Sequence, residues 1–354
     1  MRPFRICTFA LFVLLVSTCV EAQQPAAGSI DDPVYTHASH LVEIEPGRHL
    51  NLYCTGNGSP TVILEAGMDS STVVWALLQP RIAATTRVCA YDRAGMGFSD
   101  ASRRPSTSVN IVDDLHALLK AAAIEPPYVL VGHSSAGIHM RLYAATYPKG
   151  IVGMVLVDPS SEYQDDSYRK LDSRHLTPQQ WQDYLGAGWG TSRQCIAAAE
   201  AGSLNSKNAL YGKCVDAPEP VFVDAIQRAM DTFEMGAGYQ RAALSEEQNF
   251  WASQLELQKA HRDLGDLPLI VLTEGVRKPP AKPMPADKVA AREARDRLWI
   301  QLNAQIATWS KQGTQQIIPD VGHAIQLERP DLVAAAISDV LKTARHGRPG
   351  VGTP

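Results

Sequence analysis

The stretch from Tyr128 to Arg141 reads Tyr-Val-Leu-Val-Gly-His-Ser-Ser-Ala-Gly-Ile-His-Met-Arg. An apolar, β-branched run ends at Gly132 and a helical pattern begins at Ala136, so the sequence predicts a strand that turns into a helix with almost no loop. A serine lies on this corner. Because strand and helix backbones approach closely there, the positions two before and two after the tip must be small.

This steric requirement distinguishes the two adjacent serines. With Ser134 at the tip, the flanking positions are Gly132 and Ala136, and both are small. With Ser135 at the tip, the imidazole of His133 would have to fit where there is little room. Ser134 is therefore the predicted nucleophile.

The corner resembles the nucleophile elbow G-x-S-x-G of the α/β-hydrolase superfamily, with Ala136 in place of the second glycine. This resemblance implies a doubly wound, mostly parallel α/β sheet. It also implies catalytic residues in the chain order serine, acid, histidine, and an oxyanion hole of backbone amides. The amide of Ser135, the residue after the nucleophile, would be one arm of that hole.

Two further segments match the superfamily by position. Glu65-Ala66-Gly67-Met68-Asp69 follows a buried strand, where the superfamily usually carries His-Gly and then the residue whose amide is the other oxyanion arm. That residue is Met68 here, and Glu65 replaces the usual histidine. The run from Asp92 to Ser99 resembles the loop D-R-x-G-x-G-x-S, which we interpret as structural.

A serine hydroxyl needs a neutral imidazole to accept its proton and a carboxylate to orient that imidazole. Of the ten histidines, His323 alone lies between the last predicted strand and the amphipathic helix that follows it, within Gly-His-Ala. It is the predicted base. His133 and His139 lie too near the elbow to reach around it, and we interpret them as packing or capping residues.

The acid has three candidates. Most superfamily members carry it shortly after the penultimate strand, but that strand here runs into Thr-Glu-Gly-Val-Arg-Lys, from Thr273 to Lys278. Some families instead use the end of the strand after the nucleophile helix, where Asp158 stands. Asp158 is the predicted acid, with Glu274 and Asp287 as alternatives.

Composition indicates one soluble, well-packed body. Of 354 residues 45% are hydrophobic and 20% charged, with a formal net charge of −4, which argues against a nucleic-acid partner. Neither zinc-type histidine spacing nor a dinucleotide glycine fingerprint is present, so the sequence predicts no metal and no cofactor. The expected partner is a small-molecule substrate, and the oligomeric state is not predicted.

The N-terminus carries Arg2 and Arg5, an apolar stretch over 6–20, and a small-residue cleavage pattern ending at Ala22. This pattern predicts a signal peptide over 1–22 and a secreted or periplasmic protein with no stable membrane span after cleavage. The alternatives are a retained membrane anchor and, less favoured, lipidation at Cys19.

Four cysteines remain in the mature chain, and an even number in an oxidising compartment predicts two disulfides. Cys54 and Cys89 lie on strands that are neighbours in the usual order of this superfamily's sheet. Cys195 and Cys214 lie close together in the sequence.

Strand and helix alternate over 39–158 and again over 266–347, which are expected to form one α/β-hydrolase core. Residues 23–38, polar with Pro and Gly, are expected to be a flexible leader. Between 159 and 265 the alternation stops and helical spacing dominates, which predicts a helical cap inserted over the site.

The favoured function is therefore an exported serine hydrolase of carboxylic esters, thioesters or lactones. One alternative cleaves amide or peptide bonds, as the related prolyl aminopeptidases do. Another is a non-catalytic binding module that keeps the fold. Haloalkane dehalogenases and epoxide hydrolases of this superfamily use an aspartate nucleophile, so Ser134 argues against both. The sequence does not disclose the substrate.

Overall fold

An eight-stranded sheet organises the chain in the computed structural model, which describes residues 30–276 and 284–346. The strands are β1 Leu41–Glu45, β2 Arg48–Thr55, β3 Thr61–Glu65, β4 Val88–Tyr91, β5 Tyr128–His133, β6 Ile151–Val157, β7 Leu269–Glu274 and β8 Gly313–Ile318. Their spatial order is β1-β2-β4-β3-β5-β6-β7-β8. Strand β2 is antiparallel to β1 and β4, and the other neighbours are parallel. This arrangement confirms the predicted fold class.

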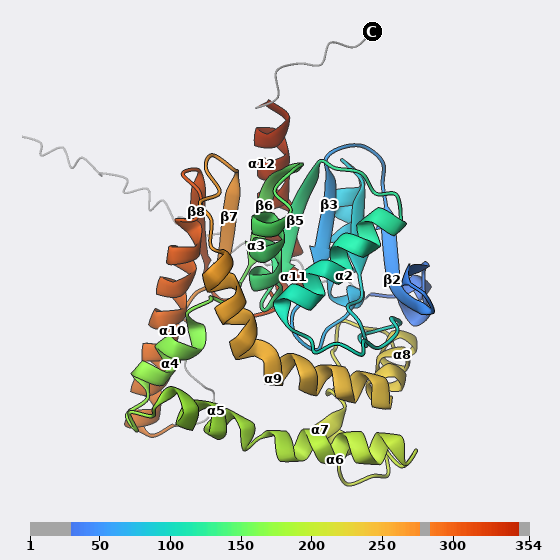
Figure 1. Cartoon of the computed structure of the whole chain (residues 1–354), viewed down its shortest axis with the longest axis vertical. Helices are drawn as coiled ribbons and strands as arrows, with labels where there is room; N and C mark the ends of the chain where they lie inside the picture. The colour runs from blue at the N-terminus through green and yellow to red at the C-terminus, as the bar shows by residue number, and fades with distance from the viewer. Residues whose placement is uncertain (1–29, 277–283, 347–354) are drawn as a thin grey trace, which may run out of the picture.

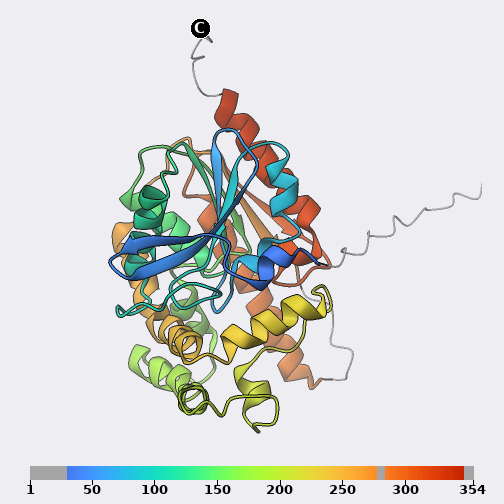
Figure 2. The same ribbon diagram turned by 90° about the vertical axis from the view of Figure 1, so that its right-hand side faces the viewer.

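Helices cover both faces of the sheet because its central strands are apolar on both sides. In β5, Leu130 packs into a core with α2 Ser108–Ala121 and α3 Ala136–Thr146. Its neighbours Val129 and Val131 pack into a second core on the opposite face, together with side chains of α1 Gln79–Ala83 and α12 Pro330–His346. Figure 2 separates these two helical layers. The remaining core helices are η1 Pro33–Thr36, η2 Thr72–Trp75, α10 Ala286–Ala307 and α11 Ile325–Glu328.

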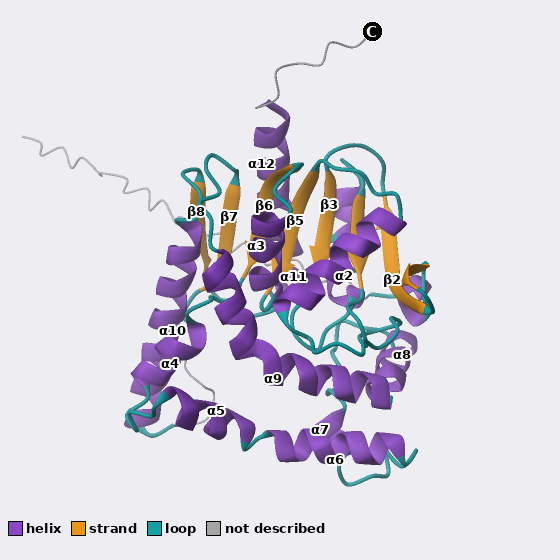
Figure 3. Ribbon diagram, viewed as in Figure 1, coloured by secondary structure: helices purple, strands orange, loops and turns teal. Residues whose placement is uncertain are grey.

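Six helices lie between β6 and β7 and gather at one end of the sheet, the lower end in Figure 1. They are α4 Gln164–Leu171, α5 Pro178–Gly186, α6 Trp189–Glu200, α7 Tyr211–Cys214, α8 Asp224–Glu234 and α9 Ala237–Ala260. This segment consists of helices joined by loops (Figure 3). Helix α9 is also part of the main core, since its Leu257 is fully buried there.

Residues 30–38 correct the expectation of a flexible leader over 23–38. Ile30 pairs with Phe222 of the inserted segment, and its side chain is buried together with those of Tyr35 and Ile226. The 3-10 helix that follows is capped by Asp32, whose carboxylate accepts from the amide of Val34. The stretch is polar in overall composition, but its apolar residues Ile30 and Tyr35 pack between the core and α8.

Both expected disulfides are present. Cys54 and Cys89 are directly opposite each other on the antiparallel pair β2 and β4. Cys195 of α6 is bonded to Cys214 of α7 within the inserted segment.

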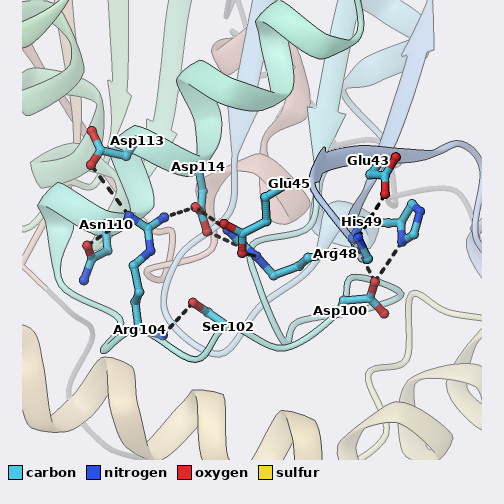
Figure 4. Close-up of polar contacts among 11 residues, drawn as sticks. Glu43, Glu45, Arg48, His49, Asp100, Ser102, Arg104, Asn110, Asp113 and Asp114 are labelled. Carbon is cyan, nitrogen blue, oxygen red and sulfur yellow. Dashed lines mark hydrogen bonds and ion pairs between the residues drawn. The ribbon is translucent and has the colours of Figure 1, made fainter.

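A buried ion-pair network ties the β1–β2 hairpin to α2 (Figure 4). The guanidinium of Arg48 donates to both carboxylate oxygens of Asp114, at 2.8 and 2.7 Å, and also pairs with Glu45. Arg104 reaches Asp114 from the loop before α2. Two buried groups of opposite charge that satisfy each other in this way fix the position of the hairpin.

The predicted signal peptide, residues 1–22, lies outside the described residues. Among the helices that the structure describes, none is both long enough and apolar enough to cross a membrane.

Candidate active site

The segments that follow the parallel strands all emerge at the same edge of the sheet, where α/β proteins bind their ligands. The segment after β3 contains Met68, and the turn after β5 contains Ser134. Asp158 follows β6, Glu274 ends β7 and His323 follows β8. All the catalytic candidates named from the sequence except Asp287 therefore belong to one edge.

The elbow places Ser134 in a strained backbone conformation. Its φ is +55°, in the left-handed region that non-glycine residues rarely adopt. A Cβ at Gly132 would lie 2.7 Å from the carbonyl oxygen of Ala136, so no larger residue fits there. The amide of Ser134 donates to the carbonyl of Val157 at 3.0 Å, which holds the turn against β6.

Ser135 differs from its neighbour in conformation and exposure. It is the N-cap of α3 with φ −56°, and its side chain is buried with no hydrogen-bond partner for the hydroxyl. Ser134, in contrast, is half-buried.

Asp158 and His323 are in direct contact. The Nδ1 atom of His323 lies 2.6 Å from Oδ2 of Asp158, although the two residues are 165 positions apart. The imidazole is 47% exposed and the carboxylate is fully buried. Since Nδ1 is engaged by the carboxylate, Nε2 is the nitrogen left to accept a proton.

The pKa of His323 lies above its ordinary value. Burial alone would lower this pKa, but the hydrogen bond to Asp158 and the negative charge of that carboxylate outweigh it.

Two further groups orient Asp158 through its second oxygen. Oδ1 accepts from the indole Nε1 of Trp299 at 2.7 Å and from the amide of Glu274 at 2.8 Å. Sequence reasoning missed Trp299, which lies on α10 far from any motif. The sequence offers one indication of its role, which is that a tryptophan stands on a helix otherwise rich in charged residues and alanine.

The alternative acids lie in different surroundings. Glu274 is close enough for its charge to help raise the pKa of His323, and its backbone amide supports Asp158. Asp287 is exposed in the first turn of α10. It lies 12 residues before Trp299, a distance of about 18 Å along a helix. The structure therefore does not bring Asp287 to His323.

His133 connects the elbow to the loop that carries His323. Its Nε2 donates to the carbonyl of His323 at 3.0 Å, and the two rings lie 4.7 Å apart between centroids. Burial and the neighbouring His323 lower the pKa of His133 to about 3, so this ring is neutral near pH 7. The imidazole of His323 thus lies beside the residue that precedes Ser134.

The segment expected to supply an oxyanion amide also lies beside Ser134. A Cβ at Gly67 would be 3.0 Å from the Cβ of Ser134 and 2.9 Å from Nδ1 of His133. Only glycine permits this approach. Met68, which follows it, is half-buried.

Glu65, which stands where the superfamily usually has histidine, makes a buried pair with a histidine of its own. The Nδ1 atom of His139, on α3, lies 2.6 Å from Oε1 of Glu65, and both side chains are buried. Histidine and carboxylate therefore join the end of β3 to the helix that begins at the elbow. Within the described ranges, no three His, Cys, Asp or Glu side chains cluster in a way that would hold a metal ion.

The chain belongs to the alpha/beta hydrolase family, whose model matches residues 62–336. The protein YqjL of Bacillus subtilis is 27% identical over 290 residues, which cover 80% of this chain and 85% of YqjL. The Probable transporter efuK of Hormonema carpetanum is 36% identical over 128 residues, 35% of this chain. That match spans only 18% of the length of efuK.

Solved structures share the architecture at low sequence identity. A haloalkane dehalogenase DbeA loop variant from Bradyrhizobium elkanii has a TM-score of 0.60 at 15% identity, covering 87% of this chain and 97% of that chain. A thermophilic esterase from Thermogutta terrifontis has a TM-score of 0.54 at 18% identity, covering 86% and 99%. At these identities the likeness concerns the fold.

Proposed function

We propose that the protein is an exported serine hydrolase that cleaves carboxylic esters, including thioesters and lactones. Ser134 is the nucleophile, His323 the base and Asp158 the acid. The observation that carries the proposal is the contact of 2.6 Å between His323 and Asp158, together with the strained elbow at Ser134, which is half-buried while Ser135 is buried.

In the proposed reaction, Oγ of Ser134 attacks the carbonyl carbon of the ester and its proton moves to Nε2 of His323. Asp158 stabilises the imidazolium through Nδ1. The amides of Met68 and Ser135 donate to the oxyanion. Collapse of the tetrahedral intermediate breaks the bond to the alcohol, which leaves with the proton from Nε2. Water then attacks the acyl-enzyme, giving up a proton to His323, and the carboxylic acid is released as Ser134 regains its proton.

The inserted helices form the cap in this proposal. The first of them begins six residues after Asp158, at Gln164, and they gather at the edge of the sheet that carries the site (Figure 1). The choice of acyl and alcohol groups would therefore depend on this segment. Export is supported by the N-terminal sequence pattern and by the two disulfides.

A fluorophosphonate probe, with p-nitrophenyl butyrate and a proline p-nitroanilide as substrates, tests the proposal. The wild type should be labelled and should hydrolyse the ester, and Ser134→Ala should do neither. Faster cleavage of the anilide than of the ester would favour the amide-cleaving alternative. A folded wild type that is neither labelled nor active would point to a binding module.

A further inference from the structure

A buried arginine holds the segment that contains Met68. The side chain of Arg93 is almost fully buried, and its guanidinium donates to the carbonyl of Ala66 at 2.5 Å and to that of Gly67 at 2.6 Å. Burial alone would lower the pKa of Arg93, but the charge of Glu246 and its hydrogen bonds outweigh this effect and raise it above its ordinary value. The guanidinium is therefore a permanent charge behind these two peptide groups.

The planarity of the peptide bond converts this contact into a constraint on the amide of Met68. The carbonyl of Gly67 and the N–H of Met68 belong to one peptide unit, and in a trans unit the two point in opposite directions. A carbonyl held by Arg93 therefore directs the N–H of Met68 away from Arg93. The positive guanidinium next to the carbonyl oxygen also polarises the peptide unit, which makes its N–H a better donor.

Helix α9 holds the same segment from the other side. Glu246 accepts from Arg93 at 2.7 and 3.0 Å and from the amide of Asp69 at 3.1 Å. The hydroxyl of Tyr239, about two turns earlier on the same face of α9, donates to the carbonyl of Asp69 at 3.0 Å. The two peptide groups that flank Met68 are thus both fixed by hydrogen bonds. The carbonyl of Gly67 accepts from Arg93, and the amide of Asp69 donates to Glu246 of the inserted segment.

We propose that Arg93 and Glu246 are positioning residues for the oxyanion hole, and that α9 aligns the amide of Met68 only when it is docked on the core. This inference rests on the proposed serine hydrolase function. It assigns the inserted segment a part in transition-state stabilisation in addition to substrate choice.

Glu246→Gln tests the inference, with Asp114→Asn as the matched control. Both changes remove one buried carboxylate from an arginine pair. Asp114 pairs with Arg48 and Arg104 (Figure 4), and neither of these arginines donates to residues 66–69. We expect Glu246→Gln to lower kcat on p-nitrophenyl butyrate roughly 10- to 100-fold, somewhat less than the loss of an oxyanion donor. The KM should stay within about twofold, because ground-state binding does not use the oxyanion amide.

A tetrahedral inhibitor separates alignment from general destabilisation. The affinity for a trifluoromethyl ketone, which forms an oxyanion on Ser134, should fall by the same factor as kcat/KM in Glu246→Gln. Asp114→Asn should lower the melting temperature but leave kcat and this affinity unchanged. Tyr239→Phe, which removes one hydroxyl, should show the same pattern as Glu246→Gln with a loss of about 2- to 5-fold.

Wild-type kcat in folded Glu246→Gln or Tyr239→Phe would overturn the inference and leave the proposed function intact. An equal loss of kcat in Asp114→Asn would also overturn it, because the effect would then follow from losing any buried pair. If the wild type itself neither hydrolyses the ester nor binds the ketone, the proposed function fails, and this inference fails with it.

Discussion

Ser134 combines a left-handed backbone with a half-buried hydroxyl, whereas Ser135 has a helical backbone and a buried one. The two side chains are chemically identical, so their different backbone conformation and burial are what distinguish them. We therefore propose Ser134, and not Ser135, as the nucleophile.

Ser134→Ala should therefore abolish ester hydrolysis, with a loss on the order of 10⁴-fold or more in kcat. The fold should remain intact, since alanine adopts the same backbone conformation at the same cost. Ser135→Ala is the matched control and should keep most of the activity. Comparison of kcat for the two variants, with folding checked by circular dichroism, decides the assignment. An active Ser134→Ala and an inactive Ser135→Ala would reverse it.

Asp158→Asn should reduce kcat/KM by about 10⁴-fold, because the amide removes the charge that stabilises the imidazolium. It should also lower the pKa of His323, which Asp158 holds above its ordinary value. His323 acts as a base only when neutral, so wild-type activity rises with pH through that raised pKa. The acidic limb of the pH–rate profile should move to lower pH in the variant.

Glu274→Gln is the control for the acid. Its backbone amide, which supports Asp158, is retained, so activity should stay within about tenfold of the wild type, and the acidic limb should move much less. A nearly active Asp158→Asn beside an inactive Glu274→Gln would transfer the acid role to Glu274.

At the residue scale, the sequence predicted the candidate site residues that lie in motifs or follow strands in the expected order. It did not predict residues whose role depends on how distant helices pack against the site. Asp158 and His323 could be named because each follows a strand whose end lies at the common edge. Trp299 and Glu246 lie on long helices with no local signal. Their roles depend on how α10 and α9 cross the sheet, which hydrophobic periodicity does not specify.

Helix α9 joins the inserted segment to the core through several buried polar contacts. A further buried polar contact joins α9 to α4 within the inserted segment: the side-chain amide of Gln254 donates to the carboxyl of Asp165 at 2.9 Å, and the backbone amide of Asp165 donates to the side-chain oxygen of Gln254 at 3.1 Å. Burial raises the pKa of Asp165 to about 6. This acid is therefore ionised at neutral pH at a cost to stability.

Asp165→Asn should raise the melting temperature at pH 8 and leave it nearly unchanged at pH 4. The folded state binds the proton of Asp165 more tightly than the unfolded state, so stability falls as pH rises from about 4 to 6. A shift of about two pKa units corresponds to about 3 kcal/mol of unfolding free energy above that window. Asparagine keeps the acceptor for Gln254 and removes the titration. Thermal melts at both pH values measure the effect.

The neighbouring residue Asp166 provides a control, because its pKa is shifted in the opposite direction. Asp166 pairs with Arg169 and Lys170, and its pKa is lowered by those hydrogen bonds despite partial burial. Asp166→Asn should leave the melting temperature unchanged or lower it slightly at pH 8. A melting temperature for Asp165→Asn that does not depend on pH would contradict the assigned burial effect.

At the scale of whole elements, amino-acid composition led to one wrong prediction, the flexible leader. Residues 30–38 read as a polar leader, yet two apolar side chains in that stretch are buried against α8. Isolated apolar residues carry no periodicity, so their burial depends on a partner surface, around Phe222 and Ile226, that appears only after folding. The strand–helix alternation of the core, in contrast, could be predicted, because the apolar residues of each strand and helix recur with the spacing typical of that element.

The whole molecule consists of a sheet covered on both faces and a helical segment over one edge. Each of these parts has its own disulfide, Cys54–Cys89 in the sheet and Cys195–Cys214 in the inserted segment. The bonded cysteines are 35 and 19 residues apart, so loop closure predicts contributions of roughly 4 and 3 kcal/mol.

The mature protein, denatured without reductant, should therefore show no free thiol, and reduction should lower its stability. The double variants Cys54→Ser/Cys89→Ser and Cys195→Ser/Cys214→Ser should each melt at a lower temperature than the wild type. Thiol titration, peptide mapping and thermal melts provide the measurements. Detection of a free thiol, or of a Cys54–Cys195 peptide, would contradict this pairing.

Six non-glycine residues in the described part of the chain have a positive φ, and four of them lie within four residues after a strand, at the edge that carries the site: Asp69, Ser134, Asp158 and Asp320. Glycine would relieve each position of about 1 kcal/mol. A laboratory evolution campaign that rewards heat resistance alone would therefore drift towards glycine at these positions and erase the chemistry. Positions at which glycine becomes enriched in such a campaign would identify where the protein keeps a strained, less stable backbone for the sake of its activity.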